Sequence, residues 1–284
     1  MRTLPPFALH RPATVGEASQ LLDEWGDDAI VHAGGTELIL VMKLGFGEYG
    51  HLVDVKGIAD LRRLEVEDGT LVIGGTVTHR EIERSPLVRD RFPALAAMES
   101  MVANVRVRTA GTLGGNLAFA DPHSDPATFL LATEAEILVR RGDAERTIPM
   151  RDFVRGPYET AIEPGELLAA VRLPLPRSGT VTLHRKMAFF ERPAVTVTCA
   201  LRREGADVVE ARIAVGSVGV VPQRMREAEA ALLGPPREGA VGAAAAAAAA
   251  ACTPMEDRNG AEDYKRNLVR VLVRRTAQEV LGAL

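Results

Sequence analysis

Two short glycine-rich segments carry the residue types best suited to bind an anion. The first, HAGGTEL, spans residues 32–38, and the second, GTLGGN, spans residues 111–116. Glycine has no Cβ, so successive backbone N–H groups in such a segment can converge on a phosphate. Threonine hydroxyls and an asparagine amide add side-chain donors. The groups that these segments offer to a phosphate are the backbone at Gly34, Gly35, Gly114 and Gly115 and the side chains of Thr36, Thr112 and Asn116.

Two such segments together suit a diphosphate, which presents oxygens on both of its sides. Asp125 follows the second segment, and an aspartate beyond a phosphate-binding segment can accept hydrogen bonds from ribose hydroxyls. The sequence contains neither the GxxxxGK[ST] pattern of a P-loop nor the GxGxxG pattern of a Rossmann fold. Each segment alone is also compatible with a tight packing turn, and the residues by themselves leave that alternative open.

The first glycine segment is positioned by a small β–turn–α–β unit, for which we assign residues 1–56. TVGE at residues 14–17 predicts a capping box at the start of a helix that ends at Gly26. Residues 29–33 (AIVHA) and 52–55 (LVDV) predict two short strands. The glycine segment follows the first of these strands and leads into a short helix.

The second glycine segment lies in a block with a different pattern, residues 57–170. Pairs of apolar segments separated by Asp-Gly or Gly-Asp predict hairpins, so we expect an α+β arrangement with mostly antiparallel strands. The predicted elements are hairpins that turn at Asp68-Gly69 and Gly142-Asp143, a helix from Thr78 to about Arg84, and a helix over residues 92–104.

A third unit follows a linker at residues 173–180. Apolar and threonine side chains alternate over residues 195–201, which is typical of a strand with one apolar face. The alanine run at residues 243–251 predicts a tightly packed helix, because alanine has the highest helix propensity. The other predicted elements are a strand over residues 207–221 and helices over residues 227–234 and 264–281.

Composition limits the possible functions. The chain has 284 residues, a formal charge of −4, 46 % apolar residues and 25 % charged residues. No apolar run approaches the roughly 18 residues that span a membrane, the first residues lack the apolar core of a signal peptide, and no basic block favours nucleic acid. Two cysteines, Cys199 and Cys252, are too few to hold an iron–sulfur cluster and suit a reducing cytoplasm.

No residue pattern indicates that the side chains of this chain perform covalent or metal chemistry. GxSxG and HExxH are absent, so we assign no catalytic residue and no metal ligand. We interpret His32 and His123 as solvent-facing or locally bonded and Cys199 as inert core. The pair Phe189-Phe190 is interpreted as core rather than as a flavin platform, and Arg106 and Arg108 as surface charges.

Four segments, taken in order, resemble the FAD-binding medium subunit of the molybdenum hydroxylases, the family of xanthine dehydrogenase and aerobic carbon monoxide dehydrogenase. The resemblance covers nearly the whole chain. It implies a PCMH-type, vanillyl-alcohol-oxidase-like FAD-binding fold of two subdomains (residues 1–56 and 57–174). A C-terminal α+β domain (residues 175–284) with a three-stranded antiparallel sheet and helices follows. The segments are AGGTELILVMKLG, RTAGTLGGNLAFADPHSDPATFLLA, SGTVTLHRKMAFFERPAVTV and GAEDYKRNLVRVLVRRTAQ.

The resemblance also implies roles for individual residues around FAD. The first glycine segment and the second would clasp the diphosphate, an aspartate would bind the ribose side, and a lysine would approach the isoalloxazine. The implied cofactor-binding residues are Ala33, Gly34, Gly35, Thr36 and Glu37 in the first clasp, Thr112, Gly114, Gly115 and Asn116 in the second, and Asp125 and Lys186.

In this family the FAD subunit passes electrons from the [2Fe–2S] clusters of a small subunit to an external acceptor, and a large molybdopterin subunit oxidises the substrate. The resemblance implies these partners, a dimer of heterotrimers and a cytoplasmic location. This chain departs from the family at Thr109-Ala110, Asp125-Pro126-Ala127 and Phe189-Phe190. The departures leave open the residue that stacks on the flavin and the electron acceptor. Two alternatives are a self-sufficient flavin oxidoreductase and an assembly module without FAD.

Overall fold

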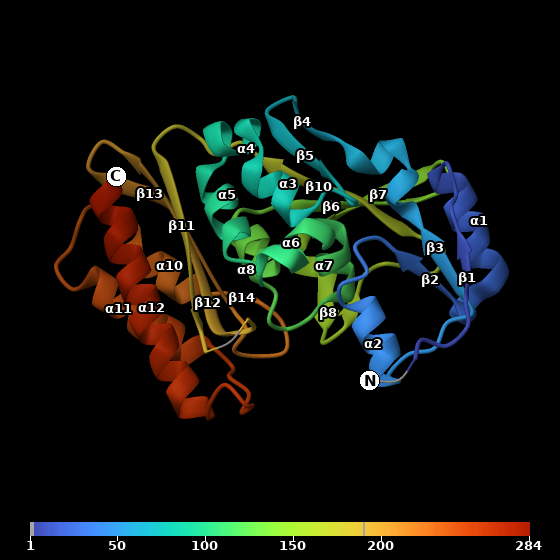
Figure 1. Ribbon diagram of the computed structural model, residues 1–284. Helices are drawn as coiled ribbons and strands as arrows, with labels where there is room; N and C mark the ends of the chain where they lie inside the picture. Colours follow the sequence, from blue (N-terminus) through green and yellow to red (C-terminus); the bar gives the residue numbers. More distant parts are fainter. Residues whose placement is uncertain (1–2, 190) are drawn as a thin grey trace.

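The computed structural model describes residues 3–189 and 191–284, which form three main sheets with helices around them (Figure 1). The N-terminal sheet is parallel, with the order β1-β3-β2. Thr14 caps the first helix by accepting a hydrogen bond from the Glu17 amide. The carboxylate of Glu17 accepts from the amide of Ala13, one residue before the position that a capping box predicts. The elements of this unit are β1 (Ala8–His10), α1 (Val15–Trp25), β2 (Ala29–His32), α2 (Leu38–Leu44) and β3 (His51–Asp54), with 3-10 turns at Gly26–Asp28, Val55–Gly57 and Ala59–Arg62.

The second sheet has five antiparallel strands in the order β4-β5-β10-β6-β7. Both predicted hairpins are confirmed, since β4 pairs with β5 and β6 pairs with β7. Side chains of the strands and helices share one apolar core. The elements are β4 (Leu64–Glu67), β5 (Thr70–Gly74), α3 (His79–Arg84), α4 (Pro86–Arg91), α5 (Pro93–Ser100), α6 (Val105–Ala110), α7 (Leu113–Phe119), α8 (Asp125–Ala132), β6 (Glu136–Arg141), β7 (Ala144–Pro149), α9 (Met150–Phe153), β8 (Val154–Gly156), β9 (Glu159–Thr160) and β10 (Leu167–Pro174).

The helix predicted over residues 92–104 is confirmed over Pro93–Ser100 and is wrong over residues 101–104. Helix α5 ends at Ser100, and Ala103 adopts a positive φ of 39°. Asn104 then caps a new helix, α6, because its side-chain oxygen accepts from the amides of Arg106 and Val107. The chain therefore turns just before the second glycine segment instead of running straight into it.

The C-terminal unit has three long antiparallel strands, β11 (Thr180–Ala188), β12 (Pro193–Glu204) and β13 (Asp207–Gly216), extended by the two-residue β14 (Gln223–Arg224). Helices α10 (Arg226–Leu232), α11 (Ala240–Ala251) and α12 (Glu262–Ala283) pack on one face of this sheet, as the red and orange helices in Figure 1 show. The opposite face rests on α8. There the threonines predicted for this face of β12 are buried, and Thr196 bonds Thr128 at 2.9 Å.

The predicted strand over residues 207–221 is shorter than expected and ends at Gly216, where Ser217 turns with φ 64°. The tightly packed alanine helix is confirmed, because one face of α11 is fully buried. Within the described residues, no helix is both long and apolar enough to cross a bilayer.

Candidate functional site

The first glycine segment follows strand β2, and its two glycines leave the backbone there without side chains. Gly35 has φ 70°, a conformation that side chains rarely adopt, and a Cβ on it would lie 2.7 Å from Nε2 of His32. Among the hydrogen bonds of residues 3–189 and 191–284, none has the amide of Gly34, Gly35, Thr36 or Glu37 as its donor. Four successive N–H groups without an acceptor form the kind of concave donor set that binds anions.

The two glycine segments touch each other, although about 75 residues separate them in the chain. A Cβ on Gly34 would overlap the carbonyl oxygen of Ala110 and would lie 2.6 Å from Cα of Gly111. The hydroxyl of Thr36 reaches the same point, since it lies 3.2 Å from the position of a Cβ on Gly111. The absence of side chains at Gly34 and Gly111 therefore permits this contact.

The second segment uses most of its polar groups internally. Thr112 caps α7 by accepting from the amide of Gly115 at 3.0 Å, and Asn116 accepts from the hydroxyl of Ser124 at 2.6 Å. Gly114 is buried against the backbone of Gly75, whose Cα would lie 2.7 Å from a Cβ at residue 114. The Gly115 amide is therefore used within the segment. The Thr112 hydroxyl and the Asn116 side chain act as acceptors in these bonds, and their predicted contacts with a phosphate stay predictions.

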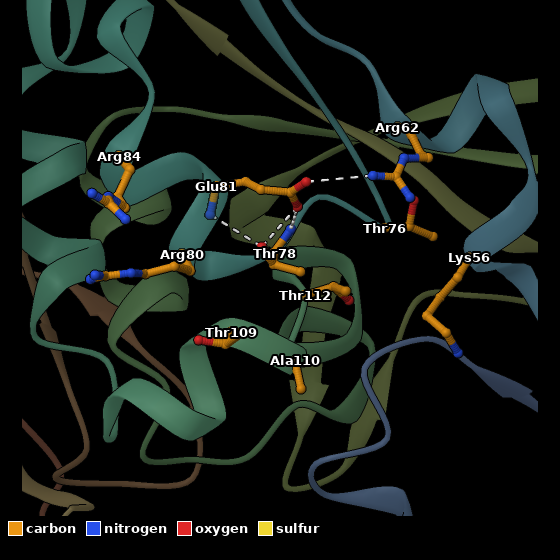
Figure 2. Close-up of a pocket in the computed structure, with 10 residues that line it drawn as sticks. All are labelled: Lys56, Arg62, Thr76, Thr78, Arg80, Glu81, Arg84, Thr109, Ala110 and Thr112. Atoms are coloured by element: carbon orange, nitrogen blue, oxygen red, sulfur yellow. Dashed lines mark hydrogen bonds and ion pairs between the residues drawn. The ribbon is translucent and has the colours of Figure 1, made fainter.

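A cavity of about 390 Å³ opens beside the contact between the two segments (Figure 2). Its wall carries four basic side chains and one carboxylate, so its charge favours an anion. Figure 2 shows Lys56 and Arg62 on one side, Arg80 and Arg84 on the other, and Glu81 between them. The lining residues are Lys56, Arg62, Thr76, Thr78, Arg80, Glu81, Arg84, Thr109, Ala110 and Thr112.

Glu81 is already occupied by its own chain. Its carboxylate closes a capping box at the start of α3 by accepting from the amide and the hydroxyl of Thr78, at 2.8 and 2.7 Å. Its other oxygen lies 3.5 Å from Arg62. The carboxylate therefore shapes the wall. Lys56 and Arg80 also pair with carboxylates outside the lining, Asp54 and Glu83, each at 2.7 Å, so the positive charge of these two side chains is partly balanced.

Lys56 connects this cavity to the first glycine segment. Its ammonium donates to the carbonyl of Ala33 at 3.1 Å, to Asp54 at 2.7 Å and to Nδ1 of His32 at 3.1 Å. Burial raises the pKa of Asp54, but the hydrogen bonds and charge of Lys56 outweigh it, so the pKa is lowered overall. Burial and the same ammonium lower the pKa of His32. His32 is thus locally bonded, as the sequence predicts.

Asp125 and Lys186, which the resemblance places at opposite ends of the flavin dinucleotide, are joined by an ion pair of 2.9 Å. Asp125 is 4 % exposed and also lies 3.4 Å from Nε2 of His184. Lys186 donates in addition to the carbonyl of Met101. The ribose contact of Asp125 stays a prediction, and the structure gives this carboxylate two protein partners at the boundary with the C-terminal unit.

Arg192, at the start of the C-terminal sheet, links the ends of both glycine regions. One of its guanidinium nitrogens lies 3.3 Å from the carboxylate of Glu37, and the other lies 3.0 Å from that of Asp121. Burial raises the pKa of Glu37, and the charge of Arg192 opposes this rise. Glu37 therefore bonds to the C-terminal unit in addition to ending the first glycine segment.

The interpretations of the pair Phe189-Phe190 and of Cys199 can also be compared with the structure. Phe189 is not core, because it is 49 % exposed, and its ring stacks on Tyr264. Phe190 lies outside the described residues. Cys199 is buried core as predicted, and burial, together with the charge of Glu229, raises the pKa of its thiol to about 12.

Arg108 is held by hydrogen bonds to its own chain and is not a free surface charge. Its guanidinium donates to Glu83 at 3.0 Å and to the carbonyls of Val102 and Ala103. Sequence reasoning missed the four basic residues of the cavity, because Lys56 and Arg62 come from two 3-10 turns and Arg80 and Arg84 from α3, and the four form no local motif. The only sequence signal for these residues is the number of basic side chains in this region, and many protein surfaces have a similar number.

Comparison with known proteins places this geometry in context. The profile described as "FAD binding domain in molybdopterin dehydrogenase" matches residues 5–176. The profile "CO dehydrogenase flavoprotein C-terminal domain" matches residues 191–280. The chain is 36 % identical over 274 residues to the carbon monoxide dehydrogenase medium chain of Hydrogenophaga pseudoflava, covering 95 % of this chain and 96 % of that protein. It is 26 % identical to the putative xanthine dehydrogenase FAD-binding subunit of Escherichia coli K12, covering 96 % of each.

Solved structures agree over nearly the full length. The carbon monoxide dehydrogenase of Hydrogenophaga pseudoflava that lacks the Mo-pyranopterin moiety superposes with a TM-score of 0.95 at 35 % identity, covering 99 % of each chain. Quinoline 2-oxidoreductase from Pseudomonas putida 86 superposes with a TM-score of 0.93 at 27 % identity, again covering 99 % of each chain. The expected fold class is therefore confirmed.

Proposed function

The chain belongs to the family of FAD-binding subunits of the molybdopterin dehydrogenases, and from this membership we propose how its residues hold the cofactor and which partners it serves. It is an oxidoreductase subunit. FAD, when bound, supplies the redox chemistry by taking electrons from a partner's iron–sulfur clusters and releasing them to an external acceptor. The residues of this chain bind and orient the dinucleotide, and we assign none of them a covalent or proton-transfer role.

The observation that carries the proposal is the contact between the two glycine segments. Four amides without acceptors, at Gly34, Gly35, Thr36 and Glu37, belong to a segment that packs against Ala110 and Gly111, beside a cavity with four basic side chains. A diphosphate carries two negative charges, so its binding site needs hydrogen-bond donors and cationic side chains but no general base. The residues present therefore fit the diphosphate of FAD, and Ala33 contributes by fixing the segment through Lys56.

The second segment acts mainly as the rigid wall of the site. Thr112, Gly115 and Asn116 hold its shape through internal hydrogen bonds. Gly114 seats helix α7 on the neighbouring backbone, and no hydrogen bond of the described residues uses its amide as donor. We assign the Gly114 amide to the diphosphate. Gly115 is exposed, and its lack of a side chain keeps this wall open to the cofactor.

In this proposal Lys186 lies at the isoalloxazine end of the site, and Asp125, whose ribose contact stays a prediction, is its ion-pair partner. Their ion pair lies where the C-terminal sheet meets α8, and the side chain of Lys186 is 15 % exposed while that of Asp125 is 4 % exposed. The lysine is thus the member of the pair that can contact a ligand. Asp125 orients it, and the carbonyl of Met101 fixes its second hydrogen bond.

The partners that we propose are a small [2Fe–2S] subunit and a large molybdopterin subunit, arranged as a dimer of heterotrimers in the cytoplasm. The relatives named as medium chains support this, because that name implies larger and smaller companions. The chain has only two cysteines, both buried and unpaired, so clusters must come from elsewhere. We further propose three units, at residues 1–56, 57–174 and 175–284, each of which contains one of the main sheets.

The test is to purify the native assembly through this chain and to quantify flavin released by denaturation. We expect about one FAD per chain, with co-purifying iron and molybdenum. A colourless assembly that takes up no added FAD would refute the proposal. Turnover of an organic substrate by this chain alone, loaded with FAD and without partners, would instead support the self-sufficient oxidoreductase.

A further inference from the structure

A buried histidine that the proposed function leaves without a role lies beside the ion pair of Asp125 and Lys186. His184 lies two residues before Lys186 on β11, so both side chains point to the same face of that strand. The side chain of His184 is 1 % exposed, and its ring meets that of Phe129 edge-on, with 6.4 Å between the ring centroids. Burial of an imidazole costs free energy unless its nitrogens find partners, so these partners indicate its role.

Both ring nitrogens of His184 have a polar partner. Nε2 lies 3.4 Å from Oδ1 of Asp125, and Nδ1 lies 2.8 Å from the hydroxyl of Thr198, which is opposite His184 on β12. A carboxylate that is paired with an ammonium only accepts hydrogen bonds, so the network of partners assigns a hydrogen to Nε2. The neutral ring meets this requirement and accepts from Thr198 through Nδ1, so the contact needs no charge on His184.

The two oxygens of Asp125 are held by two residues from one face of β11. Lys186 donates to Oδ2 at 2.9 Å, and His184 reaches Oδ1. A carboxylate bonded through one oxygen is free to rotate about its Cβ–Cγ bond, whereas a donor on each oxygen fixes the plane of the group. His184 therefore fixes the orientation of the acceptor that Lys186 uses.

The ammonium of Lys186 keeps one donor for a ligand. An ammonium has three N–H groups, and two of them are used, on Asp125 and on the carbonyl of Met101. Within the described part of the chain, no third acceptor is bonded to this nitrogen, and the side chain is 15 % exposed. Because the three N–H groups have fixed angles between them, the direction of the third depends on where Asp125 holds its oxygen.

We propose that His184 is a positioning residue of the cofactor site, which acts through Asp125 to aim the third N–H of Lys186 at the isoalloxazine end of FAD. This inference rests on the proposed function, which places Lys186 at that end. A donor fixed in this direction stabilises the electron-rich reduced isoalloxazine more than the oxidised form. Loss of the direction therefore weakens FAD binding and lowers the midpoint potential of the bound flavin.

Two substitutions at His184 separate this orientation from simple packing. Leucine fills the space without a donor, whereas glutamine places a donor near the position of Nε2. We expect the native assembly with His184→Leu, stripped of FAD and titrated with it, to bind FAD about tenfold more weakly, close to the loss of one hydrogen bond with a charged partner. We also expect spectroelectrochemistry to show a lower midpoint potential of the bound flavin, and His184→Gln to restore most of both values.

Cys199→Ala is the matched control, because it removes a buried side chain from β12 without touching this network. Cys199 follows Thr198, points to the opposite face of the strand and packs in the core beneath the helices. We expect this variant to lose thermal stability and to keep the FAD affinity and midpoint potential of the wild type. If His184→Leu also loses stability alone, its role is packing and the inference is overturned.

A further variant leaves His184 in place. Thr198→Val keeps the shape of the side chain and removes the partner of Nδ1, so the ring is held less firmly. We expect FAD affinity to fall severalfold and the midpoint potential to move in the same direction as in His184→Leu, and wild-type values of both would overturn the inference. A wild-type assembly that takes up no FAD would refute the proposed function itself, whereas normal uptake with unaffected variants refutes only the role of His184.

Discussion

Substitution of Gly34 by alanine tests the contact on which the proposed site depends. The added Cβ would lie 2.6 Å from Cα of Gly111 and 2.9 Å from the carbonyl carbon of Ala110, whereas ordinary contacts begin near 3.4 Å. The two glycine segments must therefore separate by about 1 Å, because both obstacles are backbone atoms that no rotamer change can move.

This separation has two measurable costs. Overpacking of this kind lowers the free energy of unfolding by about 1 to 3 kcal/mol. The same shift widens the clasp, so donors set for one diphosphate lose their common geometry. If about 1.4 kcal/mol of binding free energy is lost, FAD affinity falls about tenfold.

The assay is urea unfolding of the chain, together with FAD titration of the stripped assembly followed by quenching of flavin fluorescence. Gly57→Ala is the matched control, because a Cβ at Gly57 meets nothing within 4 Å and its φ lies outside the strained region. We expect the control to change stability by less than about 0.5 kcal/mol and to leave FAD affinity unchanged. If Gly34→Ala binds FAD as tightly as Gly57→Ala, the two segments do not form the diphosphate site.

Three further substitutions probe the surroundings of the site. Lys186→Met leaves a buried carboxylate without its ammonium, so we expect urea unfolding to show a loss of about 3 to 5 kcal/mol and the flavin spectrum to shift. Arg192→Ala breaks a half-exposed contact with Glu37, so stability should change by less than about 1 kcal/mol while stopped-flow measurements show faster FAD release; unchanged release would contradict a bridging role. Burial raises the pKa of Glu166, but its hydrogen bonds to Arg146 lower it overall. Because the folded state then binds fewer protons than the unfolded state, this stabilisation is present above pH 4.5 and is lost as the pH falls through the lowered pKa. We therefore expect the free energy of unfolding of Glu166→Gln, measured by urea unfolding, to depend less on pH in that range than that of the wild type.

Local signals in the sequence predicted much of the fold. The turn at Asp68-Gly69 and the cap at Thr78 depend on residues within three positions of each other, and both appear as expected. The helix predicted over residues 92–104 was extended about four residues too far, because its composition is helical throughout, while the break is imposed by a cap at Asn104 that competes with helix continuation. Such a competition is decided by tertiary packing, which a single sequence does not display.

The sequence predicted the glycines of the candidate site but not its charged residues. Gly34 stands in a recognisable motif, but the reason for its lack of a side chain is the backbone at residue 110, which no local pattern encodes. The same holds for Gly114, which needs Gly75. The ion pair between Asp125 and Lys186 joins residues that the resemblance assigned to different parts of the cofactor, because their proximity arises only when the C-terminal sheet docks on α8.

The docking of the C-terminal sheet supports our proposal that this unit is part of the cofactor site rather than an appended domain. Its polar contacts with the rest of the chain gather at the ends of the two glycine regions and along α8. Without the C-terminal unit, a carboxylate that is 4 % exposed would lose both of its partners, and Glu37 would lose its guanidinium. The FAD-binding part is therefore electrostatically incomplete alone, and any movement of the sheet changes the charges around the flavin. These contacts include Asp125 with Lys186 and His184, Asn104 with Glu191, Glu37 and Asp121 with Arg192, His123 with the carbonyl of Pro193, and Thr128 with Thr196.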